Sequence, residues 1–388
     1  MNEPKTKWPI QLFNLISRNG AINSDRLIKA ARRKTKLNNL GSDFDAEPLD
    51  VLCQSINKEA GLHPFGMFMM KQKLIGQLES RLWAEHWFEK HPEILEQPLL
   101  PVILITGLQR TGTTKLQRLL SDMPEVRGLK SWEGLYPAPV KESSETDVRI
   151  KKTKMNEKAV RWISPSFYSI HPVEHDNYEE DVLLLDLQFM SSSSEAIMNV
   201  PSYAAYLDGT DQTVAYQYEI KLLRLLQWQR GGTHWLIKSP HHLEFLDTLS
   251  ELIPDIHLIW THRDPKTTIP SYMSMLYHGR RMFSDQVSKP EIVDHWVTKI
   301  DRMLTKGLKD LSTIRNTKHL HFADLMDNQD ATLEKICDWT GIQYQASIQV
   351  ESNYKSRHTY DLKDWELTAD DINKRFDYYI QAMNSFKE

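Results

Sequence analysis

The sequence has few cysteines and no long apolar segment. Only two of its 388 residues are cysteines, Cys53 and Cys337, and they lie far apart in the chain. That spacing provides neither a disulfide framework nor a thiolate metal site, which favours a reducing compartment. The N-terminus lacks the apolar run of a signal peptide, and no run approaches the roughly 20 residues of a spanning helix. We therefore expect a cytoplasmic protein without a transmembrane segment.

The sequence also lacks an excess of positive charge. Its formal net charge is −4, whereas proteins that coat nucleic acids are usually basic, so we expect no nucleic-acid partner. Apolar residues make up 40% of the chain, which supports a packed core and argues against disorder. A local basic pocket for a small anion is still compatible with these numbers, because net charge does not fix local arrangement.

A lysine is absent from the most informative stretch, ITGLQRTGTT, where four residues separate Gly107 from Gly112. In a nucleotide-hydrolysing phosphate loop, Lys and then Ser or Thr follow the second glycine. Here Thr113 and Thr114 follow it, and the cation precedes it as Arg110. The loop therefore suits an anionic ligand, but it lacks the residue that reaches the outer phosphates of ATP.

Strands and helices alternate around this loop. Residues 102–106 form a continuous apolar run, which is typical of a strand buried on both faces, and a helical leucine pattern follows the loop. HWLIKSP and DIHLIWTHRDP are two further strand-like runs. This alternation predicts an α/β fold of the P-loop type, with three layers and a central parallel sheet flanked by helices. Residues 1–95 look helical, and we expect them to pack on a catalytic domain formed by residues 96–388.

Three cations follow three separate predicted strands. Arg110, Lys238 and Arg263 each lie just past a strand end. In open parallel sheets, ligands bind beyond the carboxyl ends of the strands. A lysine at a helix start, as Lys238 is, is electrostatically unfavourable unless an anion binds beside it. The sequence therefore predicts that the three side chains converge on one anionic ligand.

Two of these segments carry a family resemblance. LITGLQRTGTTKLQRLL resembles the 5′-phosphosulfate loop of sulfotransferases that use 3′-phosphoadenosine 5′-phosphosulfate (PAPS). THRDPKTTIPSYMSML resembles their 3′-phosphate motif, with Arg263 and, eight residues later, Ser271. HWLIKSPHHLEFL and SRHTYDLKDWELT are similar to segments of the bacterial-type branch, so the resemblance covers roughly residues 20–385. Many relatives have Lys where this chain has Arg110. Arg keeps the positive charge, but it donates a proton less readily than Lys.

The resemblance implies that the sulfuryl group of PAPS moves to a hydroxyl or amine of a small-molecule, lipid or sugar acceptor. Negative charge then grows on the leaving phosphate oxygen, and fixed donors can stabilise it, so we expect no metal. The residues that the resemblance assigns to the nucleotide are Gly107, Gln109, Arg110, Thr111, Gly112, Thr113, Thr114, Arg263, Ser271 and Arg357.

The acceptor must lose a proton as it attacks, so a general base is required. Glu133, in GLKSWEGLYP, is the first candidate, because several carboxylate-using sulfotransferases have a Glu at the matching place. His175 is the alternative, since the ordinary pKa of histidine suits the role. Lys238 is expected to hold a sulfate oxygen or bridge to the acceptor.

Two other classes compete with this interpretation. A P-loop phosphotransferase is disfavoured by the missing loop lysine. A non-catalytic, degenerate sulfotransferase is disfavoured because Arg110, Glu133 and Arg263 are all present. The sequence leaves the acceptor and the oligomeric state open.

Overall fold

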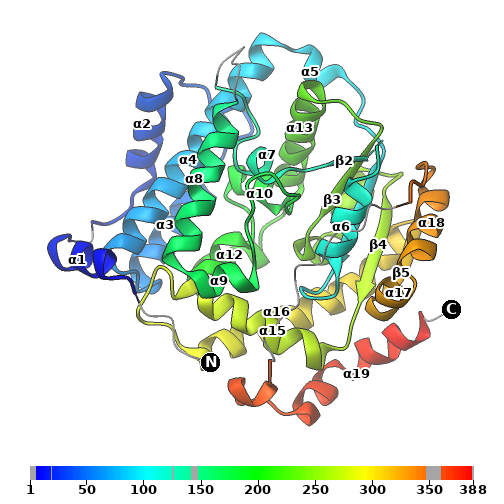
Figure 1. Cartoon of the computed structure of the whole chain (residues 1–388). Helices are drawn as coiled ribbons and strands as arrows, with labels where there is room; N and C mark the ends of the chain where they lie inside the picture. The colour runs from blue at the N-terminus through cyan, green and yellow to red at the C-terminus, as the bar shows by residue number, and fades with distance from the viewer. Residues whose placement is uncertain (1–5, 19, 125, 141–146, 347–359, 387–388) are drawn as a thin grey trace.

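The centre of the molecule is a five-stranded parallel sheet with the strand order β2-β3-β1-β4-β5 (Figure 1). It is seen in a computed structural model that describes residues 6–18, 20–124, 126–140, 147–346 and 360–386. The strands are β1 (Val102–Gly107), β2 (Val126–Gly128), β3 (His234–Lys238), β4 (His257–His262) and β5 (Asn316–His321). The predicted α/β fold with a central parallel sheet is therefore confirmed.

The central strand β1 is buried on both faces. Ile103 and Ile105 belong to one apolar cluster, whereas Val102 and Leu104 belong to another. Successive side chains of a strand point to opposite faces, so the two clusters lie on the two sides of the sheet. The continuous apolar run is what a strand covered on both faces requires.

Helices cover both faces of the sheet. One apolar cluster joins the strands to three helices: α6 (Thr113–Ser121), α17 (Phe322–Asp327) and α18 (Gln329–Thr340). The other cluster includes buried residues of α13 (Thr213–Gln229), α14 (Leu246–Leu252), α16 (Lys289–Asp310) and α19 (Ala369–Ser385), among further helices. The architecture therefore has the three predicted layers, and Figure 1 shows α17 and α18 beside β5.

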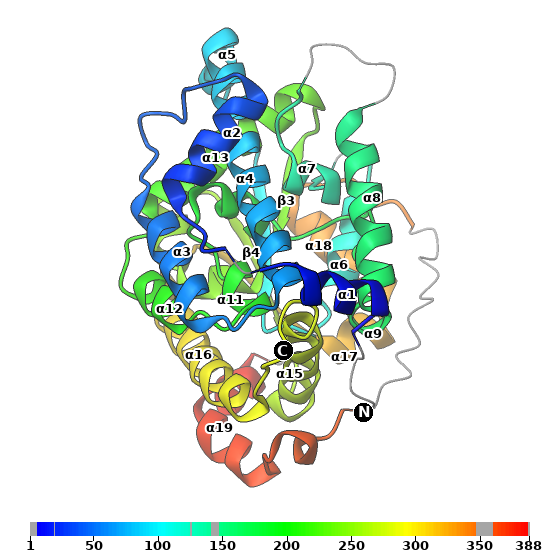
Figure 2. The same ribbon diagram turned by 90° about the vertical axis from the view of Figure 1, so that its left-hand side faces the viewer.

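The N-terminal helices extend the second cluster. They are α1 (Trp8–Ile16), α2 (Ser24–Thr35), α3 (Glu47–Glu59), α4 (Pro64–Lys90) and α5 (Glu93–Glu96). Buried residues of α2 to α5 belong to the same apolar cluster as Val102 and Leu104, and Figure 2 shows α1 to α4 on the side that faces the viewer. The predicted helical character of this region is therefore found in its described residues, while the division of the chain into two domains stays a prediction.

Further helices connect these parts of the chain. They are α7 (Ser131–Leu135), α8 (Val148–Ile163), α9 (Pro165–Ile170), α10 (Val182–Leu185), α11 (Ser193–Ile197), α12 (Pro201–Asp208) and α15 (Pro265–Arg280). Short 3-10 turns complete the chain at η1 (Asp186–Gln188), η2 (Pro240–Glu244), η3 (Leu311–Thr313) and η4 (Leu362–Trp365). Within the described residues, no helix has the length and apolar character needed to span a bilayer.

Candidate active site

The glycine loop joins the carboxyl end of β1 to α6 and depends on both of its glycines. Gly107 has φ 141° and Gly112 has φ 93°, values that side-chain-bearing residues rarely adopt. A Cβ atom on Gly107 would lie 2.4 Å from the carbonyl oxygen of Thr261, and one on Gly112 would lie 2.8 Å from the ring of Phe322. The loop is therefore pressed closely against β4 and the start of α17.

Arg110 lies at the turn of this loop in a left-handed conformation. Its φ of 72° is uncommon for a residue other than glycine, and such backbone strain is often found at functional sites. The Nε of Arg110 donates a hydrogen bond of 3.1 Å to the hydroxyl of Ser271 on α15. The turn thus brings the cation of the first motif to the serine of the second.

Arg263, just past the end of β4, completes this group. Its Nη1 donates a 3.0 Å hydrogen bond to the carbonyl oxygen of Arg110, and its guanidinium lies 4.2 Å from the ring centre of Phe322. Burial, together with the charge of Arg110, holds the pKa of Arg263 below its ordinary value. Two neighbouring cations repel each other, so a bound anion would relieve an unfavourable arrangement.

The threonines of the loop have different environments. Thr111 is buried, and its hydroxyl contacts the Leu108 carbonyl and the Thr261 hydroxyl, both at 2.6 Å. Its side chain therefore shapes the loop and is occupied by the protein. Thr113 and Thr114 begin α6, and neither hydroxyl has a protein partner among the described residues. These two hydroxyls, with the first amides of the helix, are available to an anion.

Two residues of the predicted nucleotide set add little to this geometry. Gln109 is half-buried and makes no hydrogen bond within the described part of the chain. Arg357 lies outside the described residues.

Lys238 lies at the same edge of the sheet as the loop. It is the last residue of β3 and stands in register with Ile105 of β1. Its buried Nζ donates a 2.8 Å hydrogen bond to the carboxylate of Glu180, whose side chain is 26% exposed. Lys238 is therefore a buried cation that holds a partly accessible carboxylate.

Glu180 was not among the predicted site residues. It lies in the acidic run NYEED, where Glu179 has the same side chain one position earlier. Tertiary contacts with Lys238 and Ser239 distinguish Glu180 from Glu179, so no local sequence signal could have selected it.

A buried polar network fixes the residue that follows Glu180. Asp181 accepts a hydrogen bond of 3.0 Å from the main-chain N–H of Lys238 and contacts His242 Nε2 at 2.8 Å. Burial opposes ionisation of Asp181, but His242 more than offsets it and lowers the Asp181 pKa. Burial and the charge of Asp181 raise the pKa of Glu219 well above its ordinary value. The segment that carries Glu180 is thus anchored to the end of β3.

Asp181, Glu219 and His242 also bring three potential metal-ligating atoms within 4.8 Å of one another. Asp181 and Glu219 share a side-chain hydrogen bond, and the raised pKa of Glu219 favours its protonated form in this contact. This hydrogen bonding accounts for the close approach of the three groups without an ion.

Glu133, the first predicted general base, is engaged elsewhere. Its buried carboxylate accepts hydrogen bonds of 2.7 and 2.8 Å from Arg127, and another of 3.1 Å from Arg230. Burial alone would raise the Glu133 pKa, but the two arginines more than offset this and lower it. Arg127 is in register with Trp235 near the start of β3, whereas Lys238 ends that strand. The Glu133 carboxylate is therefore engaged by two arginines, and its role as the general base stays a prediction.

His175, the alternative base, is held by another element. Its Nδ1 lies 2.7 Å from a carboxylate oxygen of Glu157 on α8, and its main-chain N–H donates to the same oxygen at 3.0 Å. Among the described residues, no recorded contact joins His175 to Lys238 or to the glycine loop. The structure therefore does not bring this histidine together with the other predicted site residues.

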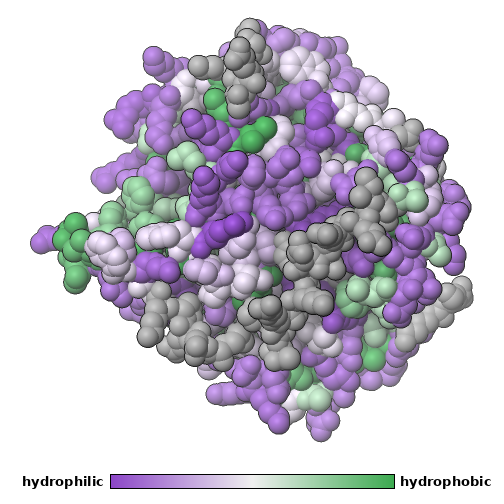
Figure 3. All heavy atoms as spheres, in the orientation of Figure 1, coloured by the Kyte–Doolittle hydropathy of each residue, from purple (hydrophilic) through white to green (hydrophobic). Residues whose placement is uncertain are grey.

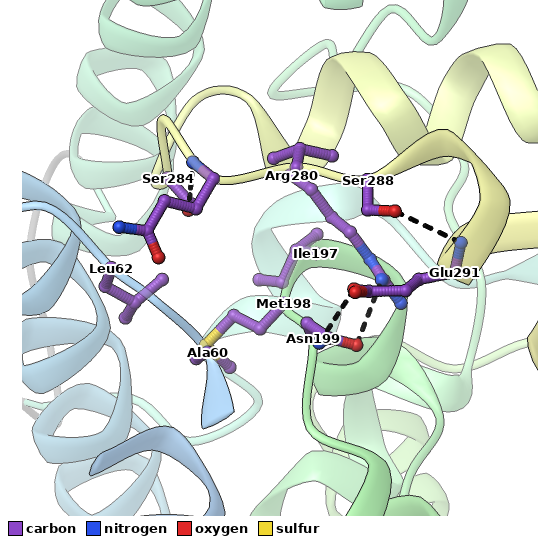
Figure 4. Close-up of a pocket in the computed structure, with 11 residues that line it drawn as sticks. Ala60, Leu62, Ile197, Met198, Asn199, Arg280, Ser284, Ser288 and Glu291 are labelled. Carbon is purple, nitrogen blue, oxygen red and sulfur yellow. Dashed lines mark hydrogen bonds between the residues drawn. The ribbon is translucent and has the colours of Figure 1, made fainter. Parts of the chain in front are cut away.

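A small pocket lies apart from this group of residues (Figure 4). Its volume of about 10 Å³ is enough for roughly one water molecule. Arg280 lines it and donates a long hydrogen bond of 3.5 Å to the side chain of Asn199, while its buried Nε has no partner in the described chain. Burial lowers the pKa of Arg280 to about 10. No predicted site residue lines this pocket.

A parallel sheet with a glycine loop and three cations at its carboxyl edge defines an α/β protein of the P-loop type. Residues 101–346 match the Sulfotransferase family. The chain belongs to this family, because the match extends over more than half of its length.

Solved structures agree with this assignment. The sulfotransferase STF1 from Mycobacterium tuberculosis H37Rv is 28% identical, with a TM-score of 0.81 over 92% of this chain and 99% of that one. The sulfotransferase STF9 from Mycobacterium avium is 23% identical, with a TM-score of 0.84 over 94% of this chain and 98% of that one. The second likeness supports the fold alone. No curated protein sequence matches the chain.

Proposed function

We propose that the protein transfers the sulfuryl group of PAPS to a hydroxyl or amine of a small-molecule, lipid or sugar acceptor. The observation that carries this proposal is the contact of Arg110 with both Ser271 and Arg263, which unites the two PAPS-like motifs. Membership of the sulfotransferase family supports sulfotransfer as the general activity.

The residues around the loop have the chemistry that a doubly phosphorylated nucleotide requires. Gly107 and Gly112 let the loop pack tightly against Thr261 and Phe322, and this packing holds the amides at the start of α6 in place for an anion. Arg263 and Ser271 would hold the 3′-phosphate, a group for which arginine is the favoured bidentate partner. PAPS, when bound, supplies the activated sulfuryl group.

The loop also suits the charge that develops during transfer. As the bond from sulfur to the phosphate oxygen breaks, negative charge grows on that oxygen, and preorganised donors stabilise it. Arg110, the hydroxyls of Thr113 and Thr114, and the first amides of α6 would serve as these donors. Their positions are fixed by the loop before the ligand arrives, so little reorganisation accompanies the reaction.

We assign the general base to Glu180 in preference to Glu133 and His175. Its carboxylate is partly exposed and adjoins Lys238, which would hold a sulfuryl oxygen. The acceptor oxygen forms its bond to sulfur while its proton passes to Glu180. Asp181 acts as a positioning residue, because it binds the main chain of Lys238 and the ring of His242.

Incubation with sulfur-labelled PAPS tests the proposal. Pools of phenols, lipids and oligosaccharides are offered separately, and mass spectrometry identifies the acceptor that gains a sulfate. Calorimetry with adenosine 3′,5′-bisphosphate measures the nucleotide site independently of the acceptor. Absence of bisphosphate binding would overturn the donor assignment, whereas binding without turnover in any pool would favour the non-catalytic alternative.

A further inference from the structure

The N-terminal helix α1 exposes an apolar face. The side chains of Trp8, Leu12, Leu15 and Ile16 are 73%, 49%, 83% and 76% exposed. Their spacing of i, i+4, i+7 and i+8 places them on one side of the helix. Figure 3 shows hydrophobic side chains at the extremity of the molecule where Figure 1 places α1.

The opposite face of α1 already holds the helix on the protein. Ile10 is buried there, and the ring of Phe13 packs 5.8 Å from Phe65 and 5.9 Å from Phe68. Asn14 accepts a 2.9 Å hydrogen bond from the main-chain N–H of Phe65. A helix with apolar residues on opposite sides is normally covered on both, so the exposed face is suited to a further partner.

Cations surround the exposed face. Lys7 and Arg18 flank α1, and Lys71 follows the 46% exposed Phe68 on α4. Residues 6–18 contain no acidic side chain, and none of the three cations forms an ion pair within the described chain. Exposed Trp, Leu and Ile beside Lys and Arg are typical of helices that lie in the interface of an anionic bilayer.

We propose that this face, formed by Trp8, Leu12, Leu15, Ile16 and Phe68, docks the protein on an anionic lipid bilayer. The helix has 9 residues, far fewer than a spanning helix needs, so it would lie in the plane of the interface. The proposal is independent of the sulfotransferase activity.

A second copy of the chain fits this face less well. A two-fold interface is formed by the same surface on both partners, so it would place the two cationic rims against each other. A convex helix at the extremity of the molecule also offers little area for the roughly 800 Å² per partner of a stable interface. An anionic headgroup layer instead complements Lys7, Arg18 and Lys71.

Sedimentation of the full chain with vesicles tests the docking. We expect binding to vesicles of mixed phosphatidylcholine and phosphatidylglycerol, and little binding to phosphatidylcholine alone. Leu15→Glu should weaken that binding by about tenfold or more, because a charged side chain replaces buried apolar surface. Val214→Glu is the matched control, since it makes the same charge change at a 44% exposed position on α13, and it should bind as the wild type does.

Two further variants keep the test decisive. Ile16→Gln removes apolar surface without adding charge and should also weaken binding. Lys7→Glu should lower affinity for anionic vesicles by roughly fivefold or more. An unaltered midpoint of urea unfolding shows that each variant is folded. The proposal would be overturned if the wild type did not sediment with anionic vesicles, or if Leu15→Glu bound them as tightly as the wild type does. It would also be overturned if the wild type bound no vesicles but formed a dimer that Leu15→Glu dissociates.

Discussion

The guanidinium of Arg263 donates a hydrogen bond of 3.0 Å to the main-chain carbonyl of Arg110, 153 positions earlier in the chain. The same Arg110 donates through its side chain to Ser271. Two sequence motifs that are distant in the chain therefore form one contiguous surface. The proposed nucleotide site consequently depends on the loop after β1 and on the segment after β4 together.

Arg263→Ala should impair nucleotide binding. The arginine would provide charge-assisted hydrogen bonds to the 3′-phosphate, and their loss should weaken adenosine 3′,5′-bisphosphate binding by roughly tenfold to a hundredfold. Titration calorimetry measures this change. Lys266→Ala is the control, because Lys266 is nearby but pairs with Asp264 at the surface. Equal dissociation constants for Arg263→Ala and the wild type would contradict the assignment.

Glu180→Gln should lower kcat by roughly 10²- to 10⁴-fold, the usual contribution of a general base. The amide is close in size to the carboxylate but cannot accept the acceptor's proton. Bisphosphate affinity should not change, because Glu180 is placed on the acceptor side of the reaction. The neighbouring Glu179→Gln is the matched control. If both variants retained full kcat, the base would have to be sought elsewhere.

Glu133→Gln should affect stability more than catalysis. The change leaves the buried guanidinium of Arg127 without its bidentate counter-charge, and breaking a buried pair costs about 3 kcal/mol or more. Urea unfolding measures the loss. If the Glu133→Gln protein is stable and its kcat falls, while the kcat of Glu180→Gln does not fall, Glu133 would again be the better candidate for the base.

The sequence predicts the centre of the sheet well and its edges poorly. β1, β3 and β4 each contain an uninterrupted apolar run of at least three residues because both faces are covered, and this pattern is readable without coordinates. β5, Asn316–His321, is half-exposed over four of its six residues and contains Lys and His, so it carries no such pattern. An edge strand of this kind is determined by its neighbour β4 rather than by its own composition.

The same contrast applies to the candidate site. The contact of Arg110 with Arg263 and Ser271 could be predicted, because the two motifs follow the neighbouring parallel strands β1 and β4. The different surroundings of Glu133 and Glu180 could not, since they depend on which distant cation each carboxylate meets. Arg127 and Arg230 engage the first, and Lys238 holds the second.

Acid should destabilise the protein through a buried histidine. Burial, reinforced by neighbouring His319 and His321, lowers the pKa of His262 from 6.5 to about 2. Below about pH 6.5 the unfolded chain therefore binds a proton that the folded protein does not, so the free energy of unfolding falls as pH decreases. This term can reach about 2 kcal/mol by about pH 5.

Urea unfolding at about pH 7.5 and about pH 5 measures this effect. His262→Gln removes the titrating ring, so its free energy of unfolding should depend less on pH than that of the wild type. His234→Gln is the control, because His234 is a half-exposed histidine at the start of β3. Identical pH dependence of the wild type and His262→Gln would contradict the expectation.

Gly107→Ala should damage the loop more than its size suggests. The new methyl group would meet the Thr261 carbonyl at 2.4 Å and would force a side-chain residue to adopt φ 141°. We expect a loss of at least about 2 kcal/mol of stability together with the loss of bisphosphate binding. Gly76→Ala is the matched control: Gly76 lies within α4 with no atom in reach of a new Cβ, so alanine should stabilise that helix by about 0.5–1 kcal/mol. Urea unfolding measures the stability of the two variants, and calorimetry measures their bisphosphate binding. If Gly107→Ala had the stability and the affinity of the wild type, the close approach of the loop to β4 would be dispensable.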